Sequence, residues 1–127
     1  RDATGDMVKI IKENKSKLVY GGVMHCYAGS VETARELLNS GLYISFAGPL
    51  TFKNANTLLE VAKYVPEDRI LTETDSPYLT PHPFRGKVNT PKNIPLMVEK
   101  LAILRQKTME EIASQVMSNA KTLFKKI

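Results

Sequence analysis

Three side chains with metal-binding chemistry follow short apolar runs in the sequence. His25 closes the run LVYGGVMH at residues 18–25, and Glu73 and Asp75 follow the run RILT at residues 69–72. If both runs form parallel strands, their carboxyl ends meet at one edge of the sheet, where α/β proteins gather ligands. An imidazole and two carboxylates suit magnesium, manganese or zinc. The pattern therefore predicts a divalent-metal site at this edge.

Each of these residues also has a purely structural explanation. His25 after an apolar run is typical of a core or capping histidine, and Asp75 begins an Asp-Ser-Pro turn in which the carboxylate accepts backbone N–H bonds. Glu73 and Asp75, two positions apart, would share a face if the strand stays extended. Three groups are also too few for a closed hydrolytic site, so further ligands must come from outside the chain.

Other kinds of catalytic site have little support. The sequence has no Ser or Cys nucleophile with a recognisable base, no phosphate-cradling glycine loop and no dinucleotide fingerprint. Cys26 is the only cysteine, which excludes an internal disulfide and a thiolate-clustered zinc site, and we expect it to be a small buried residue. We expect His82 to be exposed to solvent. Arg85, Lys87 and Asn89 form either a solvated patch or a set of phosphate contacts.

The elements that position these residues alternate between helices and strands. Helical spacing favours a surface helix that stops at residues 14–16, a helix capped by Ser30 and stopped by Gly41, and a helix over residues 55–65. Strands are expected at residues 18–25, 42–46 and 69–72. Further helices begin near residue 95 and after a capping box of Thr108 and Glu111, and Ser118 is expected to cap the last one.

This alternation predicts an α/β fold. Strands separated by helices, without hairpin signals, indicate right-handed crossovers and a parallel sheet. Residues 76–95 hold five prolines, too many for a regular element, and form a long loop of the kind that carries function. No repeat or composition break divides residues 1–127, so we expect a single domain.

The bulk composition excludes several classes of protein. With 43% hydrophobic and 24% charged residues, the 127-residue chain is globular rather than disordered. It has no run of eighteen apolar residues, and its start, RDATG, lacks the pattern of a signal peptide, so we expect a truncated, cytoplasmic protein without a membrane segment. The net charge of +5 permits a polyanionic partner but does not by itself indicate one.

Several stretches together resemble the TatD family of metal-dependent deoxyribonucleases, within the amidohydrolase-like TIM barrels. They are residues 24–30 (MHCYAGS), 43–48 (YISFAG), 51–55 (TFKNA), 73–79 (ETDSPYL) and 83–89 (PFRGKVN), with the closing pairs at 119–120 and 123–124. The resemblance covers essentially the whole chain in order. It implies a partial TIM (β/α)8 barrel, made of roughly the last three strands with their helices, so that residues 1–127 are the truncated C-terminal half.

The resemblance also implies roles for individual residues. His25 would be a metal ligand at the end of the sixth barrel strand, and Asp75 a metal ligand and catalytic base at the end of the eighth. Glu73 would contact the ligand residues or stabilise the fold, and would not bind the metal itself. Arg85 and Asn89 would hold substrate or shape the site. The family's remaining ligands have no counterpart here, and residues 1–3 (RDA) match the segment just after a ligand histidine on strand five.

The implied reaction is the hydrolysis of DNA phosphodiester bonds with two divalent ions (Mg, Mn or Zn) in the intact protein. The chain alone is expected to be inactive, with uncovered barrel-lining residues and an open strand edge that favour self-association or pairing with the missing N-terminal half. Two alternatives remain open. One is a metal-dependent amide or ester hydrolase acting on a small molecule, and the other is a non-catalytic interaction module that binds nucleic acid through its charge.

Overall fold

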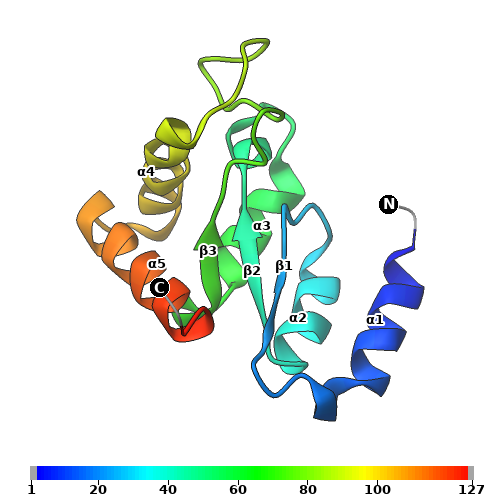
Figure 1. Ribbon diagram of the computed structural model, residues 1–127. Coiled ribbons are helices and arrows are strands. Elements are labelled where there is room, and N and C mark those ends of the chain that lie inside the picture. The colour runs from blue at the N-terminus through cyan, green and yellow to red at the C-terminus, as the bar shows by residue number, and fades with distance from the viewer. Residues whose placement is uncertain (1–2, 126–127) are drawn as a thin grey trace.

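A computed structural model describes residues 3–125, so part of the RDA match at the N-terminus lies outside the described residues. Its centre is a sheet of three parallel strands in the order β1 (Gly22–Met24), β2 (Leu42–Phe46) and β3 (Ile70–Thr72), as Figure 1 shows. Two crossover helices, α2 (Val31–Asn39) and α3 (Asn56–Tyr64), join these strands. The predicted α/β class and parallel sheet are confirmed.

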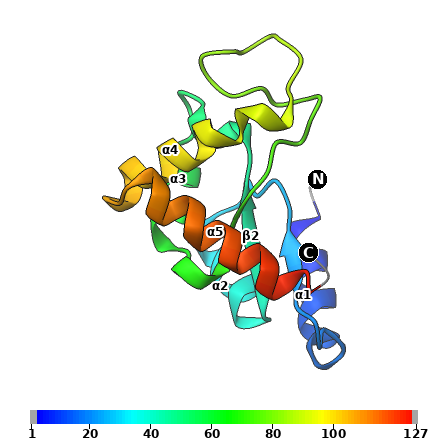
Figure 2. The same ribbon diagram turned by 60° about the vertical axis from the view of Figure 1, so that its left-hand side comes forward.

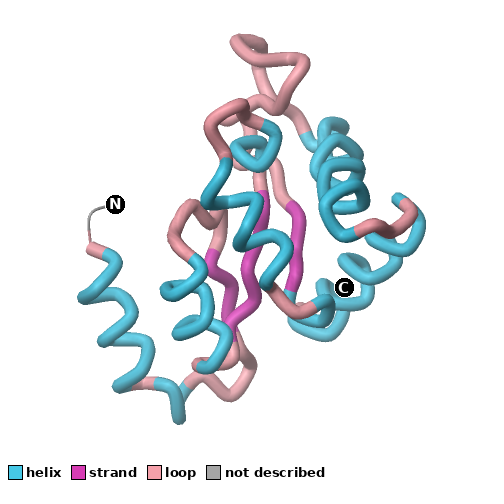
Figure 3. Tube along the Cα trace, turned by 180° about the vertical axis from the view of Figure 1, so that it is seen from behind, coloured by secondary structure: helices cyan, strands magenta, loops and turns pink. Residues whose placement is uncertain are grey.

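The helices that connect the strands cover one face of the sheet. Seen from behind in Figure 3, α2 and α3 lie over the strands, and α1 (Thr4–Glu13) packs outside α2. Alternate residues of β2, namely Leu42, Ile44 and Phe46, point into this layer and join its core. The core is completed by apolar residues of the helices, chiefly Ala34, Leu37, Leu58, Val61, Leu101 and Ile112.

The expected helix ends agree with the structure. The Ser30 hydroxyl accepts a hydrogen bond from Thr33 N, and Gly41 takes a left-handed conformation with φ +88° after α2. Thr108 and Glu111 make both bonds of a capping box at the start of α5 (Met109–Leu123). These local signals are satisfied within a few residues of the chain, so sequence alone could place them.

One predicted boundary near the C-terminus is wrong. Ser118 does not begin a helix but lies inside α5, because residues 109–123 contain no glycine or proline that would end it. The next residue, Asn119, is buried and its amide nitrogen donates to Glu67 O at 2.7 Å and Ile70 O at 2.8 Å. These bonds tie the continuous helix to the start of β3, and Figure 2 shows α5 crossing in front of the sheet.

The first strand is shorter than predicted. Residues 15–17 form a turn of 3-10 helix, and Gly21 N donates to Leu18 O in a further turn, so pairing begins only at Gly22. Val19 and Tyr20, expected inside a buried strand, are 74% and 76% exposed. Their apolar character predicted a strand, but the left-handed backbone of Gly21, with φ +75°, separates them from the sheet.

The expectation of uncovered barrel-lining residues is wrong for the middle of the sheet. Tyr43 and Leu71, on the face away from α2 and α3, are each only 6% exposed. The Arg69 guanidinium lies 5.1 Å from the centre of the Tyr43 ring and covers part of this face. Both outer strands, however, pair on one side only among the described residues, so β1 and β3 keep open edges.

The predicted long loop is present at the carboxyl end of the strands. Residues 73–90 contain no helix or strand, and a short 3-10 turn (Pro91–Asn93) leads into α4 (Ile94–Arg105). Figure 1 shows this loop projecting above the sheet. Among residues 3–125, no helix has the length and apolar character needed to cross a bilayer.

Candidate metal centre

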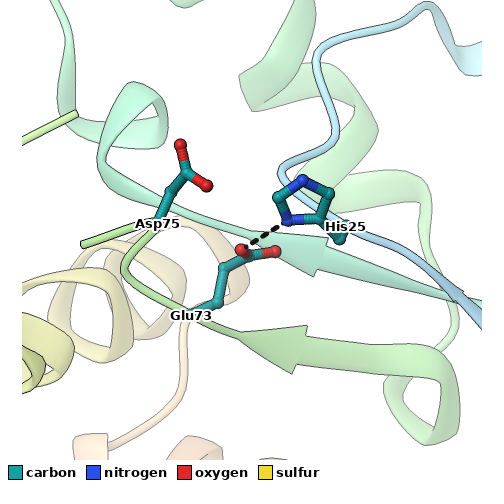
Figure 4. Close-up of side chains that lie close together, drawn as sticks. All are labelled: His25, Glu73 and Asp75. Atoms are coloured by element: carbon teal, nitrogen blue, oxygen red, sulfur yellow. Dashed lines mark hydrogen bonds and ion pairs between the residues drawn. The ribbon is translucent and has the colours of Figure 1, made fainter. Parts of the chain in front are cut away.

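His25 and Glu73 meet although they come after strands that are not neighbours. His25 comes directly after β1 and Glu73 directly after β3, with β2 between them. The Glu73 side chain reaches across the end of β2, and its Oε2 lies 2.9 Å from His25 Nδ1 (Figure 4). The predicted meeting of strand ends is therefore confirmed for this pair.

Hydrogen bonds hold both the backbone and the side chain of Glu73. Its backbone N–H donates to Phe46 O at 3.0 Å, and its Oε1 accepts from Cys26 N at 2.6 Å. Burial acts to raise the pKa of Glu73, but hydrogen bonds from Cys26 N–H, Ser45 and His25 outweigh it, and the pKa lies below its usual value. Glu73 is therefore ionised at neutral pH and acts only as an acceptor.

The charge of Glu73 decides which ring nitrogen of His25 carries a proton. Because an ionised carboxylate can only accept, Nδ1 must donate, and Nε2 of the neutral ring is left with a free lone pair. The hydrogen bond to Glu73 raises the pKa of His25, partly offset by desolvation and helped by the charges of Glu73 and Asp75. The His25 side chain is 67% exposed, so a ligand can reach Nε2.

Asp75 reaches the same site by a bend in the backbone. The strand ends at Thr72, and Asp75 has a left-handed φ of +56°, so the backbone does not stay extended from Glu73 to Asp75. Aspartate is among the residues that tolerate this conformation. In Figure 4 the Asp75 carboxylate lies beside Glu73 and His25, and one ligand atom from each of the three lies within 4.8 Å of the others.

These donors fit a divalent cation. Within residues 3–125 the Asp75 carboxylate accepts no hydrogen bond, which also removes the turn-capping explanation for it. A free carboxylate and a free imidazole nitrogen are suitable ligands for magnesium, manganese or zinc. Glu73 is bonded on both oxygens and instead orients His25, as carboxylates commonly do behind ligand histidines. Two free ligands remain fewer than a closed site needs.

Asn89 lies beside this site but inside the protein. It is 2% exposed, and its Nδ2 donates to Thr74 O at 2.8 Å and Tyr78 O at 2.7 Å. Its Oδ1 accepts from Thr90 N at 3.0 Å and Asn93 Nδ2 at 2.8 Å. All the hydrogen-bonding capacity of the side chain is used, so Asn89 shapes the loop that carries Asp75 and has no polar group left for substrate.

Arg85 lies on the exposed part of the loop, and the structure does not bring it into the cluster of His25, Glu73 and Asp75. One guanidinium nitrogen donates to Thr80 O at 2.9 Å, and the group lies 3.9 Å from the centre of the Phe52 ring. Phe52 was not singled out from the sequence. Its signal was only its place in the stretch TFKNA.

Three residues near the site, His82, Cys26 and Gly48, differ in exposure and in what they contribute. His82 is exposed, as predicted, with its ring edge-on to Phe52. Cys26 is half-buried, and burial raises the pKa of its thiol to about 11, so the thiol stays protonated at neutral pH. Gly48 ends the stretch YISFAG at residues 43–48, which carries part of the family resemblance. A Cβ on Gly48 would lie 1.7 Å from Leu79 O, so glycine is what lets the loop approach β2.

A model of the TatD related DNase family matches residues 1–125. The chain belongs to this family. It is 54% identical over 125 residues to the metal-dependent hydrolase YabD of Bacillus subtilis, covering 98% of the chain and 49% of YabD. It is 47% identical over 124 residues to the metal-dependent hydrolase YcfH of Escherichia coli, covering 98% of the chain and 46% of YcfH. The resemblance inferred from the motifs is confirmed.

Solved structures support the same family and fold. The TatD homologue YJJV of Escherichia coli superposes with a TM-score of 0.89 at 28% identity, over 97% of this chain and 47% of YJJV. A TatD family hydrolase of Entamoeba histolytica has a TM-score of 0.80 at 25% identity, over 97% and 48% of the two chains. The chain thus spans about half the length of the TatD relatives it matches.

Proposed function

We propose that the complete protein hydrolyses phosphodiester bonds of DNA with divalent metal ions, and that this chain supplies part of its site. The observation that carries the proposal is the convergence of His25, Glu73 and Asp75 within 4.8 Å at the carboxyl end of the sheet. Membership of the TatD related DNase family supports the substrate, and the names of YabD and YcfH support metal-dependent hydrolysis.

In this proposal His25 Nε2 and the Asp75 carboxylate would hold a cation, with Glu73 keeping the His25 ring in place. Bound divalent cations lower the pKa of water and offset charge on a phosphoryl oxygen. Asp75 would accept the proton of the water that bonds to phosphorus, and the bond from phosphorus to the leaving oxygen would break. We propose two ions, with further ligands from the part of the TatD relatives that this chain does not cover.

The same ligands would serve a small-molecule amide or ester hydrolase, because both reactions need an activated water and a polarised oxygen. The family name favours DNA over this alternative. A third possibility, a non-catalytic interaction module, would bind DNA in a salt-dependent way without any need for metal.

The test is fragment complementation. The 127-residue chain is mixed with the N-terminal half of YabD, and cleavage of single-stranded DNA is measured with magnesium or manganese. The chain alone and an Asp75→Ala variant are run in parallel. Asp68→Ala is a matched control, because Asp68 lies at the opposite end of β3 and pairs with Arg69. We expect activity only in the mixture, lost with Asp75→Ala and kept with Asp68→Ala.

Other outcomes would reject parts of the proposal. Full activity of the Asp75→Ala mixture would remove Asp75 from the site. Cleavage of small amides or esters, but not of DNA, by the active mixture would favour the alternative substrate. DNA binding that survives a chelator, with no cleavage of either substrate, would favour the interaction module.

A further inference from the structure

Three neighbouring strands each place one polar side chain on the same face of the sheet. Along β2, Ile44 and Phe46 belong to the core beneath the helices, so Ser45 between them faces the other way. By the same alternation His25, after β1, and Glu73, after β3, lie on the face of Ser45. Because β2 is the middle strand, Ser45 lies between the other two side chains.

The Glu73 side chain passes over Ser45 where it crosses the end of β2. Neighbouring strands are about 4.8 Å apart, so β1 and β3 do not touch, and Glu73 meets His25 above β2 (Figure 4). Ser45 is only 3% exposed, and its side chain is small enough to leave this space to the carboxylate. A larger side chain at position 45 would fill that space and displace Glu73.

Ser45 also supplies a donor to the carboxylate. Burial acts to raise the pKa of Glu73, and the Ser45 hydroxyl is one of the hydrogen-bond donors that lower it. The Cys26 N–H donates to Oε1 of the same carboxylate at 2.6 Å, and His25 Nδ1 lies 2.9 Å from Oε2. The carboxylate therefore has three donors around it, which together restrict its rotation.

The backbone on both sides of Ser45 holds the same arrangement. Tyr27 N donates to Ser45 O at 3.0 Å, and Glu73 N donates to Phe46 O at 3.0 Å. Cys26, which precedes Tyr27, has a left-handed φ of +45°, a conformation uncommon for residues other than glycine, and this bend accompanies its N–H bond to Glu73. The segments that follow β1 and β3 are therefore both bonded to the last two residues of β2.

We propose that Ser45 is a positioning residue of the metal centre, acting through Glu73 on His25. The hydroxyl holds the carboxylate over the end of β2, and the carboxylate in turn keeps the proton on His25 Nδ1 and leaves Nε2 free for a cation shared with Asp75. The inference rests on the proposed function and deepens it, because it adds a residue that touches neither metal nor substrate. In the opposite case Ser45 is only a small buried residue of the strand, and removing its hydroxyl has no effect on the site.

The test is zinc binding to the 127-residue chain, measured by isothermal titration calorimetry. Ser45→Ala keeps the small size but removes the hydroxyl. It should weaken zinc binding about 3- to 10-fold, less than the loss of about 10- to 100-fold for partners that touch a metal ligand directly. Ser45→Leu should weaken it further, because its side chain fills the space of the carboxylate. Ser40→Ala is the matched control, since Ser40 is a buried serine just before β2 whose hydroxyl donates to Glu36 O at 2.9 Å.

Three readouts separate positioning from stability. In urea, Ser45→Ala and Ser40→Ala should lose similar stability, because each loses one hydrogen bond, whereas only Ser45→Ala should lose zinc affinity. Nitrogen-15 NMR of the neutral His25 ring should show the proton on Nδ1 in the unaltered chain and a mixture of both tautomers in Ser45→Ala. In a double-mutant cycle, Ser45→Ala should cost no further zinc affinity once Glu73→Ala has removed the carboxylate.

The positioning role and the nuclease proposal fail separately. Equal zinc affinity of Ser45→Ala and the unaltered chain would overturn the positioning role alone, as would a full further loss on the Glu73→Ala background. If zinc binding depends on Ser45 and Glu73 as expected but the complemented protein cleaves no DNA, the nuclease proposal fails and the role of Ser45 stands. If neither the unaltered chain nor the complemented protein binds zinc, both are overturned.

Discussion

Replacement of Asn89 by alanine removes four hydrogen bonds from the base of the loop at residues 76–93. Two run from Nδ2 to the carbonyl oxygens of Thr74 and Tyr78, and two run to Oδ1 from Thr90 N and Asn93 Nδ2. A typical intramolecular hydrogen bond contributes about 0.5–1.5 kcal/mol net, and buried partners left unsatisfied cost more. Since the loop can relax and let water reach some partners, we expect a loss of about 2–4 kcal/mol.

Urea denaturation of the 127-residue chain measures this loss. With an m-value of about 2 kcal/mol/M, the unfolding midpoint should fall by about 1–2 M. Asn93→Ala is the matched control, because the Asn93 side chain gives up one hydrogen bond, the one to Asn89 Oδ1. It should cost only about 1 kcal/mol.

The result also decides between the two roles that the sequence left open for Asn89. A residue that contacts substrate and has no structural role would leave the midpoint unchanged when replaced. A midpoint for Asn89→Ala equal to that of the unaltered chain, or a smaller loss than for Asn93→Ala, would therefore refute the loop-shaping role.

Three further predictions concern the loop and the last helix. Gly48→Ala should push Leu79 and its loop away from the end of β2, because the added Cβ would lie 1.7 Å from Leu79 O, and should make residues 76–93 more sensitive to proteolysis. An unchanged digestion pattern would contradict the close approach. Thr90→Val should raise the free energy of unfolding, measured by urea denaturation, by about 1 kcal/mol, because the buried Thr90 Oγ1 has no hydrogen-bond partner among the described residues. A lower free energy of unfolding for Thr90→Val would contradict this prediction. A hydrogen bond from Thr108 N–H lowers the pKa of Glu111 from 4.5. The ionised Glu111 carboxylate therefore stabilises the start of α5 above pH 4.5, and this stabilisation is lost as the pH falls through the lowered pKa. The melting temperature should therefore exceed that of Glu111→Gln at neutral pH and converge with it in acid, whereas a constant difference would contradict the charge effect.

Sequence reasoning succeeded where the determinants are local. The alternation of strands and helices, the Ser30 cap, the left-handed Gly41 and the capping box of Thr108 and Glu111 each depend on residues a few positions apart. The motif stretches from residues 24–30 to 83–89, taken together with the closing pairs, were likewise sufficient to place the chain in the TatD family. Local patterns failed at residues 18–21 and at Ser118, where packing or its absence decided the outcome.

The site itself depended on contacts between distant parts of the chain. Only the folded sheet brings Glu73 to His25 and to Cys26 N, and so determines which nitrogen of His25 is free. Only the packing of the loop shows that Asn89 is a buried structural residue and that Phe52 lies beneath Arg85.

The sequence by itself determined the α/β class, the family, and the residue types that gather at the ends of the strands, because these depend on short-range periodicity and on motifs. The tertiary structure decided which of those residues are free to bind and which are already bonded to the protein. The physical reason is that hydrogen-bond satisfaction and burial are properties of pairs brought together across about 50 positions of chain, as for His25 with Glu73.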